Sequence, residues 1–154
     1  SPHMAGWFSR GKRTAARKKS KAPRTKGSMP PTATGSEHDI QSRFIAIIRQ
    51  VPHPAGQWTF AIPNGFLRTG PMRIRAWREG VLSGVSDLFN PIPIGPHPGQ
   101  WLEVKTPTGK ASPEQRKFMK EMQRLGYRVD VCRSVEELLE AWCDYLQIRI
   151  EVET

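Results

Sequence analysis

Two short runs of sequence decide the fold and the chemistry of this chain, GVSDLF at residues 84–89 and WLEVK at residues 101–105. Both are apolar runs that charged side chains interrupt, which is typical of strands that carry polar groups to a site. Because side chains alternate between the faces of a pleated strand, Glu103 and Lys105 share one face. A loop rich in proline and glycine joins the two runs, and this predicts a hairpin that carries Asp87 close to Glu103.

A pair of neighbouring carboxylates needs a compensating cation. At about 4 Å, Asp87 and Glu103 would repel each other by about 4 kcal/mol at an effective dielectric constant of about 20. Mg²⁺ or Mn²⁺ would supply the charge and take oxygen ligands, with the backbone carbonyl of Val104 as a third ligand. Lys105 would then orient or deprotonate an attacking water, or stabilise charge growing on a phosphate. A surface ion pair of Glu103 with Lys105 is an equally weighted alternative.

Two further polar residues point toward the same site. Gln115 lies on the apolar stripe of a predicted helix, where an amide needs a reason to be. Glu37 lies at the inward-facing start of the first predicted helix, near the positive end of its dipole. Either residue could instead cap the end of its helix, and for Gln115 a capping box with Ser112 is a competing interpretation.

The remaining pattern alternates helices and strands, in the order α-β-α-β-β-α-β-α, and predicts an α/β fold. Trp58, Phe60 and Ile62 alternate as in a half-buried strand, and Ile74 and Trp77 share a face of a short helix with Val81. The expected elements are a helix at 36–50, a strand at 58–62, a helix at 71–80, strands at 84–89 and 100–106, a helix at 112–125, a strand at 127–132 and a helix at 134–146.

Length and composition fit one modest domain of a cytoplasmic protein. The chain has 154 residues, of which 37% are hydrophobic, and no run approaches the about 18 apolar residues of a membrane helix. Cys132 and Cys143 lack the spacing of a zinc site, so we expect two reduced, packed thiols. We expect the protein in the cytoplasm of a bacterial or phage-infected cell, without a membrane partner.

Nearly all of the net charge of +10 lies in the first 36 residues, which hold nine basic residues and no acidic one. Residues 1–4 resemble an expression scar. We expect a disordered basic tail at 1–35, in which Lys18 and Lys19 bind nucleic acid by releasing counterions, and a folded domain at 36–154. A solubilising tail or a localisation address is the alternative.

Seven short motifs follow one another along about residues 37–135. They are EHDIQ at 37–41, IPNG at 62–65, Arg73, GVSD at 84–87, EVK at 103–105, TGK at 108–110 and EQ at 114–115. In residue type and order they resemble the VRR-NUC family of PD-(D/E)XK nucleases. Ser86 stands where the superfamily's name has proline, and Asp87 is kept.

The resemblance implies a restriction-endonuclease-like core, a mixed sheet flanked by helices, and metal-dependent hydrolysis of DNA. Asp87 and Glu103 would bind the metal, with Glu37 contacting it directly or through water. Lys105 would serve the nucleophile or the transition state, and Gln115 would help to position the site. No cofactor beyond the metal is implied. Short members resemble junction resolvases, which cut branched DNA as homodimers.

Basic residues between the first strand and Asp87 are candidates for the phosphate path. We expect Arg73, Arg68 and the more distant Lys110 to contact nucleic acid. An ordinary solvated helix face is the favoured interpretation for Arg75 and Arg78.

A last apolar alternation at 148–152 predicts an additional strand, which could pair across a two-fold axis in a homodimer or pack on its own sheet. Taken together, we expect a metal-dependent DNA endonuclease that is selective for branched DNA, of the Holliday-junction or flap type. A non-catalytic nucleic-acid-binding module and a sequence-specific restriction-type enzyme are the alternatives.

Overall fold

The computed structural model describes residues 35–64 and 70–151. The expectations for the tail, including Lys18 and Lys19, and for Arg68 lie outside these residues. No helix within the described ranges is both long and apolar enough to cross a membrane. Cys132 is buried, Cys143 is half-buried, and both are free.

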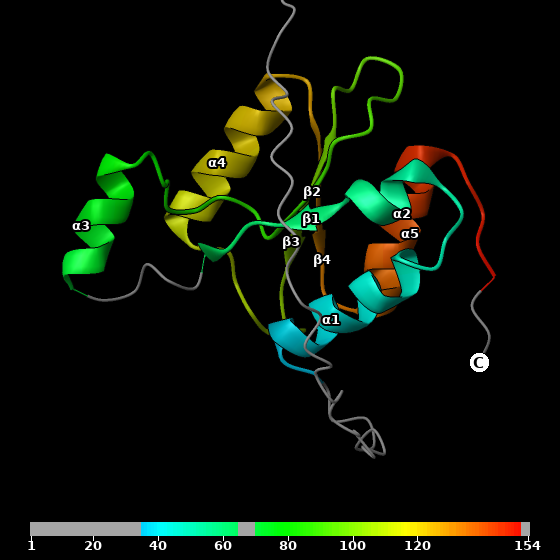
Figure 1. Cartoon of the computed structure of the whole chain (residues 1–154), viewed down its shortest axis with the longest axis horizontal. Helices are drawn as coiled ribbons and strands as arrows, with labels where there is room; N and C mark the ends of the chain where they lie inside the picture. Colours follow the sequence, from blue (N-terminus) through cyan, green and yellow to red (C-terminus); the bar gives the residue numbers. More distant parts are fainter. Residues whose placement is uncertain (1–34, 65–69, 152–154) are drawn as a thin grey trace, which may run out of the picture. The chain divides into compact units, whose positions relative to one another are not determined.

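The centre of the domain is a mixed sheet of four strands in the order β1-β2-β3-β4 (Figure 1). The pairs β1–β2 and β2–β3 are antiparallel, whereas β3–β4 is parallel. The strands are β1 (Phe60–Ala61), β2 (Leu88–Asn90), β3 (Gln100–Val104) and β4 (Arg128–Cys132). The mixed sheet and the β2–β3 hairpin confirm the expected fold class.

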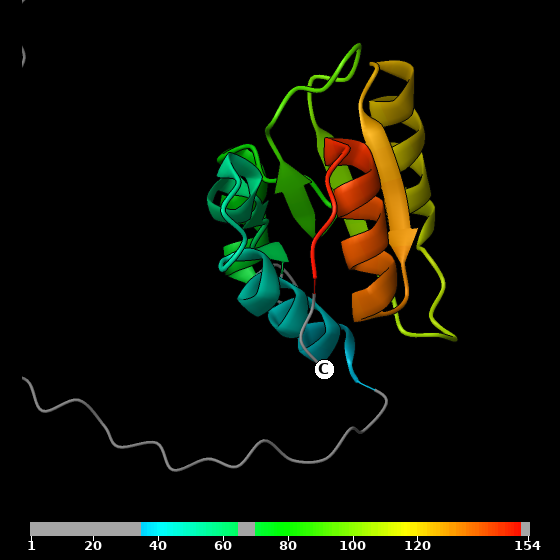
Figure 2. The same cartoon turned by 90° about the vertical axis from the view of Figure 1, so that its right-hand side faces the viewer.

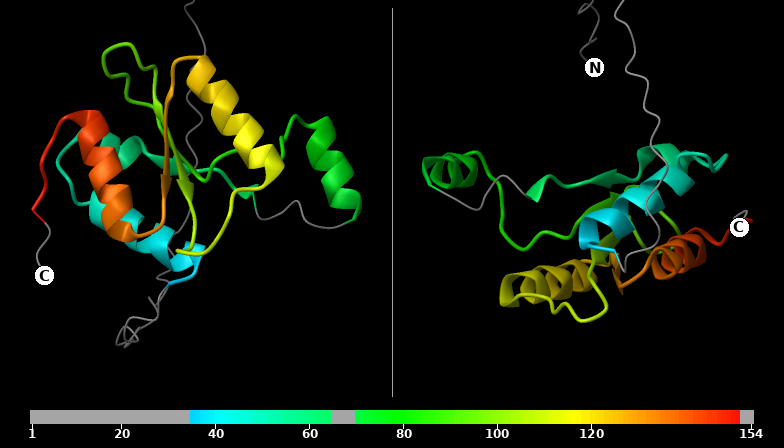
Figure 3. Two further views of the ribbon diagram at one scale, coloured as in Figure 1. Left: turned by 180° about the vertical axis from the view of Figure 1, so that it is seen from behind. Right: turned by 90° about the horizontal axis from the view of Figure 1, so that it is seen from below.

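Helices cover both faces of the sheet. Helices α1 (Glu37–Ile48) and α5 (Val135–Leu146) pack side by side on one face, as Figure 2 shows. Helix α4 (Pro113–Arg124) lies on the other face, and α3 (Pro71–Arg78) stands on the same side as α4, beyond the β1 end of the sheet (Figure 3). The short helix α2 (Pro54–Trp58) follows α1.

Alternation along β3 divides the domain between two packed layers. Leu102 and Val104 are fully buried in a core that they share with Phe44 of α1 and Trp142 of α5. On the opposite face, Trp101 packs against aromatic rings from β2 and α4, with ring centroids 4.4 Å from Phe89, in a tilted arrangement, and 5.0 Å from Phe118, edge to face. Glu103 shares that face with Trp101, because the two lie two residues apart on the strand.

The first strand differs from the alternation that the sequence suggests. Pro54 follows the capping residue His53 and opens α2, so Trp58 lies in a helix and its side chain is 65% exposed. Thr59 takes the buried position, where its hydroxyl accepts a hydrogen bond of 3.0 Å from Trp142 Nε1. The buried Trp142 indole nitrogen thus has a hydrogen-bond partner, as buried donors usually do.

The expected strand at 148–152 is wrong, and apolar side chains at two further places are exposed. Residues 148–151 form no strand, because the left-handed Gln147 (φ 57°) ends α5 and redirects the chain; residue 152 lies outside the described residues. Leu125 is 51% exposed at the end of α4. The apolar face of α3 is exposed rather than buried.

The β2–β3 connection, residues 91–99, lies at the end of the hairpin opposite Asp87 and Glu103. Ile94 and His97 pair with each other across its tip, where Gly95 is exposed. The Tyr145 hydroxyl of α5 donates to the Ile92 carbonyl and ties the base of this loop to the core.

Candidate active site

Two adjacent antiparallel strands bring the predicted carboxylates together. Leu88 pairs with Leu102, so Asp87, directly before β2, lies beside Glu103. Residues 84–87 are not part of the strand, because Gly84 has a φ of +83°, which an extended strand cannot contain. The predicted proximity of Asp87 to Glu103 is thus achieved with a shorter strand than the sequence suggests.

The Asp87 carboxylate is fixed by the backbone of the neighbouring strand. Its Oδ2 atom accepts a hydrogen bond of 2.7 Å from the Val104 amide. Burial raises the pKa of Asp87 above its usual value, the Val104 amide opposes this rise, and the charge of Glu37 adds to it. Asp87 is therefore held in place and presented to a site that disfavours free negative charge.

Glu103 is fully buried, and neither of its carboxylate oxygens has a hydrogen bond of ordinary geometry within the described residues. Burial raises the pKa of Glu103 to about 7, and the charge of Asp87 adds to the rise. The Lys105 ammonium and the Ser86 hydroxyl act in the opposite direction. A buried carboxylate without such bonds is costly, which points to a role in binding or catalysis.

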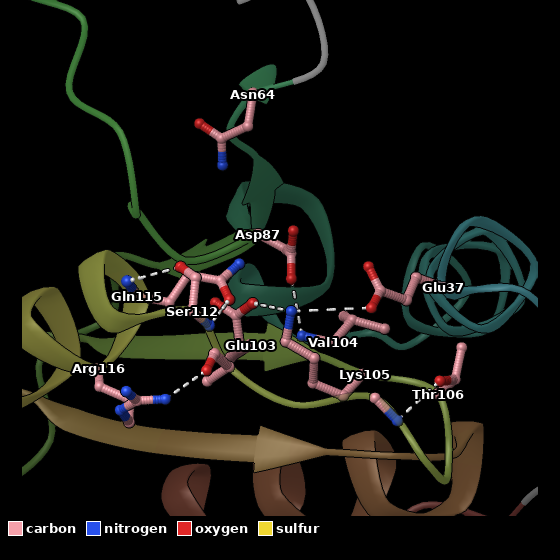
Figure 4. Close-up of polar contacts among 12 residues, drawn as sticks. Glu37, Asn64, Asp87, Glu103, Val104, Lys105, Thr106, Ser112, Gln115 and Arg116 are labelled. Atoms are coloured by element: carbon pink, nitrogen blue, oxygen red, sulfur yellow. Dashed lines mark hydrogen bonds and ion pairs between the residues drawn. The ribbon is translucent and has the colours of Figure 1, made fainter. Parts of the chain in front are cut away.

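Lys105 bridges the two acidic elements of the site. Its Nζ atom lies 3.3 Å from Glu103 Oε1 and 3.7 Å from Glu37 Oε1, between the end of β3 and the first turn of α1 (Figure 4). The Lys105 side chain is only 8% exposed and that of Glu103 only 1%. The pair is therefore buried, and the alternative of a surface ion pair is wrong.

Gln115 forms the capping box that the sequence offers as its competing role. Ser112 N donates to Gln115 Oε1 at 2.8 Å, and Gln115 N donates to Ser112 Oγ at 3.2 Å. Figure 4 shows the Gln115 amide beside Glu103. Its carbonyl oxygen serves the helix cap, which leaves the amide nitrogen for the site.

The expected nucleic-acid contacts are not part of this cluster. Arg73 is exposed on α3 and Lys110 is exposed on the loop after β3. Across residues 35–64 and 70–151, no hydrogen bond or ion pair joins either of them to the acids or to Lys105.

Two residues support the site in ways that sequence reasoning missed. The Asn64 amide, in the turn after β1, donates to the Val85 carbonyl at 2.9 Å and holds this turn against the segment before Asp87. The Arg133 guanidinium donates to the carbonyls of Thr106, at 2.8 Å, and Gly109, at 2.6 Å, which closes the loop after Lys105. Asn64 is recognisable as a turn residue, whereas nothing in the local sequence marks Arg133.

Gly84 lets the segment before Asp87 touch the start of α4. A Cβ atom at this position would lie 2.5 Å from the Glu114 carbonyl carbon and 2.6 Å from its oxygen. We expect Gly84→Ala to lower the free energy of unfolding by at least about 2 kcal/mol, since it adds this clash to the left-handed strain. Urea denaturation measures the change.

Gly80 provides the matched control, because its φ is also positive, +93°, but a Cβ atom added there would meet no other atom within 4 Å. Gly80→Ala is expected to cost only the backbone term, about 1 kcal/mol. Equal effects of the two substitutions would contradict the importance of the close approach at Gly84.

The donor set fits a hard divalent cation. The two Glu103 oxygens are buried without ordinary hydrogen bonds, and Asp87 offers its second oxygen beside them. In the described part of the chain, no three side chains of His, Cys, Asp or Glu gather closely enough to hold an ion by themselves. Water and backbone oxygen would complete the shell, as is usual for Mg²⁺.

The sheet, its flanking helices and the buried acid–lysine cluster belong together in an α/β nuclease-type fold. The family model of the VRR-NUC domain matches residues 38–136, and the chain belongs to this family. A nuclease-type domain of this kind implies nucleic-acid binding.

A solved structure described as a VRR_NUC domain protein is similar over 73% of this chain and 88% of its own, with a TM-score of 0.63 and 19% identical residues. At this identity the likeness shows the fold alone. No curated protein matches the chain.

Proposed function

We propose that the domain is a divalent-metal-dependent endonuclease that hydrolyses DNA phosphodiester bonds and prefers branched DNA. The observation that carries this proposal is the buried Glu103 carboxylate beside Asp87, which has the Lys105 ammonium 3.3 Å from Oε1 but no hydrogen bond of ordinary geometry to either oxygen within the described residues. Such a group is costly to the fold and suits an oxygen-liganded cation. The preference for branched DNA is supported by the resemblance of short family members to junction resolvases.

Each residue of the cluster has a role in this proposal. Asp87 and Glu103 would hold Mg²⁺ or Mn²⁺, with the Val104 carbonyl as a further ligand. The cation would supply a Lewis acid that activates water and neutralises phosphate charge. Glu37 would act through water or through Lys105, whose ammonium lies between the two glutamates.

Hydrolysis adds water across one P–O bond of the backbone. The water oxygen joins phosphorus, and the leaving oxygen takes a proton. The Lys105 ammonium would donate to a phosphate oxygen on which negative charge grows, while Glu103 and Glu37 hold its Nζ atom in place. Gln115 would steady the start of α4 against Glu103 and offer its amide nitrogen to the site.

The test is a panel of labelled linear, flap and four-way DNA of matched sequence, incubated with Mg²⁺, Mn²⁺ or EDTA. We expect cleavage only with a metal and fastest on the branched substrates, and Lys105→Met should slow it strongly. Metal-independent binding without any cleavage would instead support a non-catalytic module. A sharp fragment pattern on linear duplex would support a restriction-type enzyme.

The basic tail would add affinity without contributing chemistry. We expect deletion of residues 1–35 to weaken binding of all DNA forms and to reduce its salt dependence, because the segment carries nine positive charges. Binding titrations between 50 and 200 mM salt measure this change. Metal-dependent cleavage by the shortened chain should persist at low salt, and its complete loss would contradict this role.

A homodimer would place two such sites on one junction, and we propose it on the resemblance to junction resolvases alone, since residues 148–151 form no strand to pair across a two-fold axis. Light scattering at micromolar concentration tests it, and a monomeric mass would contradict it.

A further inference from the structure

Helix α3 exposes an apolar surface that no other described element covers. The helix has no buried residue, and the exposed fractions are 59% for Ile74 and 72% for Trp77. Val81, just after the helix, is 38% exposed. Large apolar side chains gathered at the surface commonly mark a binding site.

These side chains form the walls of a pocket of about 300 Å³. It is lined by Arg73, Ile74, Trp77, Val81 and Ser83. Arg73 and Trp77 lie four residues apart and therefore share one side of the helix. The pocket thus combines an aromatic ring, aliphatic surface, a hydroxyl and a guanidinium.

The pocket is close to the proposed active site along the chain. Asp87 follows Ser83 by four residues, so their Cα atoms lie at most about 14 Å apart. The intervening Gly84 touches the backbone of Glu114 and Gln115 at the start of α4. Helix α3 also stands on the side of the sheet occupied by α4 (Figure 3). The distance of at most about 14 Å between Ser83 and Asp87 corresponds to a few nucleotides of one DNA strand.

The charge of α3 favours an anionic occupant. Arg75 is paired with Glu79 at 3.0 Å, whereas Arg73 and Arg78 have no ion pair within the described residues. A second copy of this chain meeting α3 across a two-fold axis would place these arginines against themselves, which is unfavourable. A nucleic-acid strand offers both a phosphate for the guanidinium and a flat base for the indole.

We propose that this pocket receives an unpaired nucleobase, which stacks on Trp77 while Arg73 contacts an adjacent phosphate. The inference rests on the proposed nuclease function and gives it a basis for selecting structured DNA. Bases within a duplex are already stacked and hidden, whereas flaps and gaps expose unpaired bases. An aromatic platform beside a basic group is the usual means of holding such bases.

The test compares DNA binding of Trp77→Ala and Trp77→Phe by fluorescence anisotropy in EDTA, so that cleavage plays no part. The probes are a fully paired duplex and the same duplex with a short single-stranded gap. We expect Trp77→Ala to weaken binding of the gapped DNA about tenfold or more and to leave the duplex nearly unchanged. Trp77→Phe should retain most of the affinity because it keeps a ring.

Trp58 supplies the matched control, since it is a comparably exposed tryptophan on α2, at 65%. Trp58→Ala should leave the binding affinity for both DNA probes unchanged. Arg73→Ala should weaken binding of the gapped DNA and lower by about one the slope of log affinity against log salt concentration. Arg75→Ala should change neither quantity. This pattern separates a phosphate contact from a general loss of positive charge.

Equal affinity of Trp77→Ala and the parent for gapped DNA would overturn the inference, as would an equal loss on both probes. A parent dimer that Trp77→Ala converts to a monomer in light scattering would also overturn it, by showing that a second copy fills the pocket. If the parent cuts DNA and the gapped-DNA effect is absent, the pocket fails and the nuclease proposal stands. If the gapped-DNA effect is present and the parent never cuts DNA, the nuclease proposal fails and the nucleobase pocket stands.

Discussion

Asp87→Asn is expected to lower the rate of Mg²⁺-dependent DNA cleavage by at least about 10³-fold. Asparagine keeps the shape of the side chain, and its oxygen can still accept from the Val104 amide, which now donates to Asp87 Oδ2 at 2.7 Å. The substitution removes the charge that would hold the cation, a contribution of several kcal/mol, and each 1.4 kcal/mol corresponds to about a tenfold change in rate.

Single-turnover cleavage of the best substrate measures this loss, with metal-free binding measured alongside. We expect binding to be unchanged or slightly tighter, because one charge that repels phosphate is gone. Asp39→Asn, at an exposed acid in the first turn of α1, should cleave like the parent. A decrease of less than tenfold in the cleavage rate of Asp87→Asn would contradict the proposed role of Asp87 as a metal ligand.

Glu103→Gln is expected to abolish cleavage and, without metal, to stabilise the fold at pH 8. The pKa of Glu103 is raised from its usual 4.5 to about 7 by burial. Between these pH values the folded protein holds more protons than the unfolded protein, so the contribution of Glu103 to stability falls as the pH rises. At about 1.4 kcal/mol per pKa unit, the ionised side chain costs about 3 kcal/mol at pH 8.

Urea denaturation in EDTA at pH 4.5 and pH 8 measures the difference between parent and variant. We expect a gain of about 2–3 kcal/mol at pH 8 and little difference at pH 4.5, where the parent side chain is already protonated. Lys105 keeps Glu37 as its partner in the variant. Glu121→Gln, at an exposed ion pair with Arg124, should show no comparable gain. If Glu103→Gln instead destabilised the fold at pH 8, the inference that the ionised Glu103 carboxylate is costly to the fold would be contradicted.

The centre of the site could be predicted from sequence because it depends on short-range rules. Alternation along WLEVK places Glu103 and Lys105 on one face, and the hairpin brings Asp87 to Glu103. The capping pattern at Ser112 likewise predicts the start of α4. The contact of Lys105 with Glu37 depends on how α1 crosses the sheet, and its distance comes from the structure alone.

The structure departs from the local pattern where the presence or absence of tertiary contacts decides which side chains are buried. Trp58 and Phe60 satisfy the alternation of a strand, yet the hydrogen bond from Trp142 places Thr59 in the core instead. Trp77 has helical spacing with Ile74, but no described element packs against that face. Arg133 closes a loop more than 20 residues earlier in the chain, and no local rule connects the two segments.

The loop at residues 91–99 has a practical consequence for engineering. Asp87 lies just before β2 and Glu103 near the end of β3, so the exposed tip at Gly95 lies at the opposite end of the hairpin from the candidate active site. We expect a fluorescent reporter or a targeting module inserted at this tip to leave the candidate active site intact, provided that the Tyr145 anchor at Ile92 is kept.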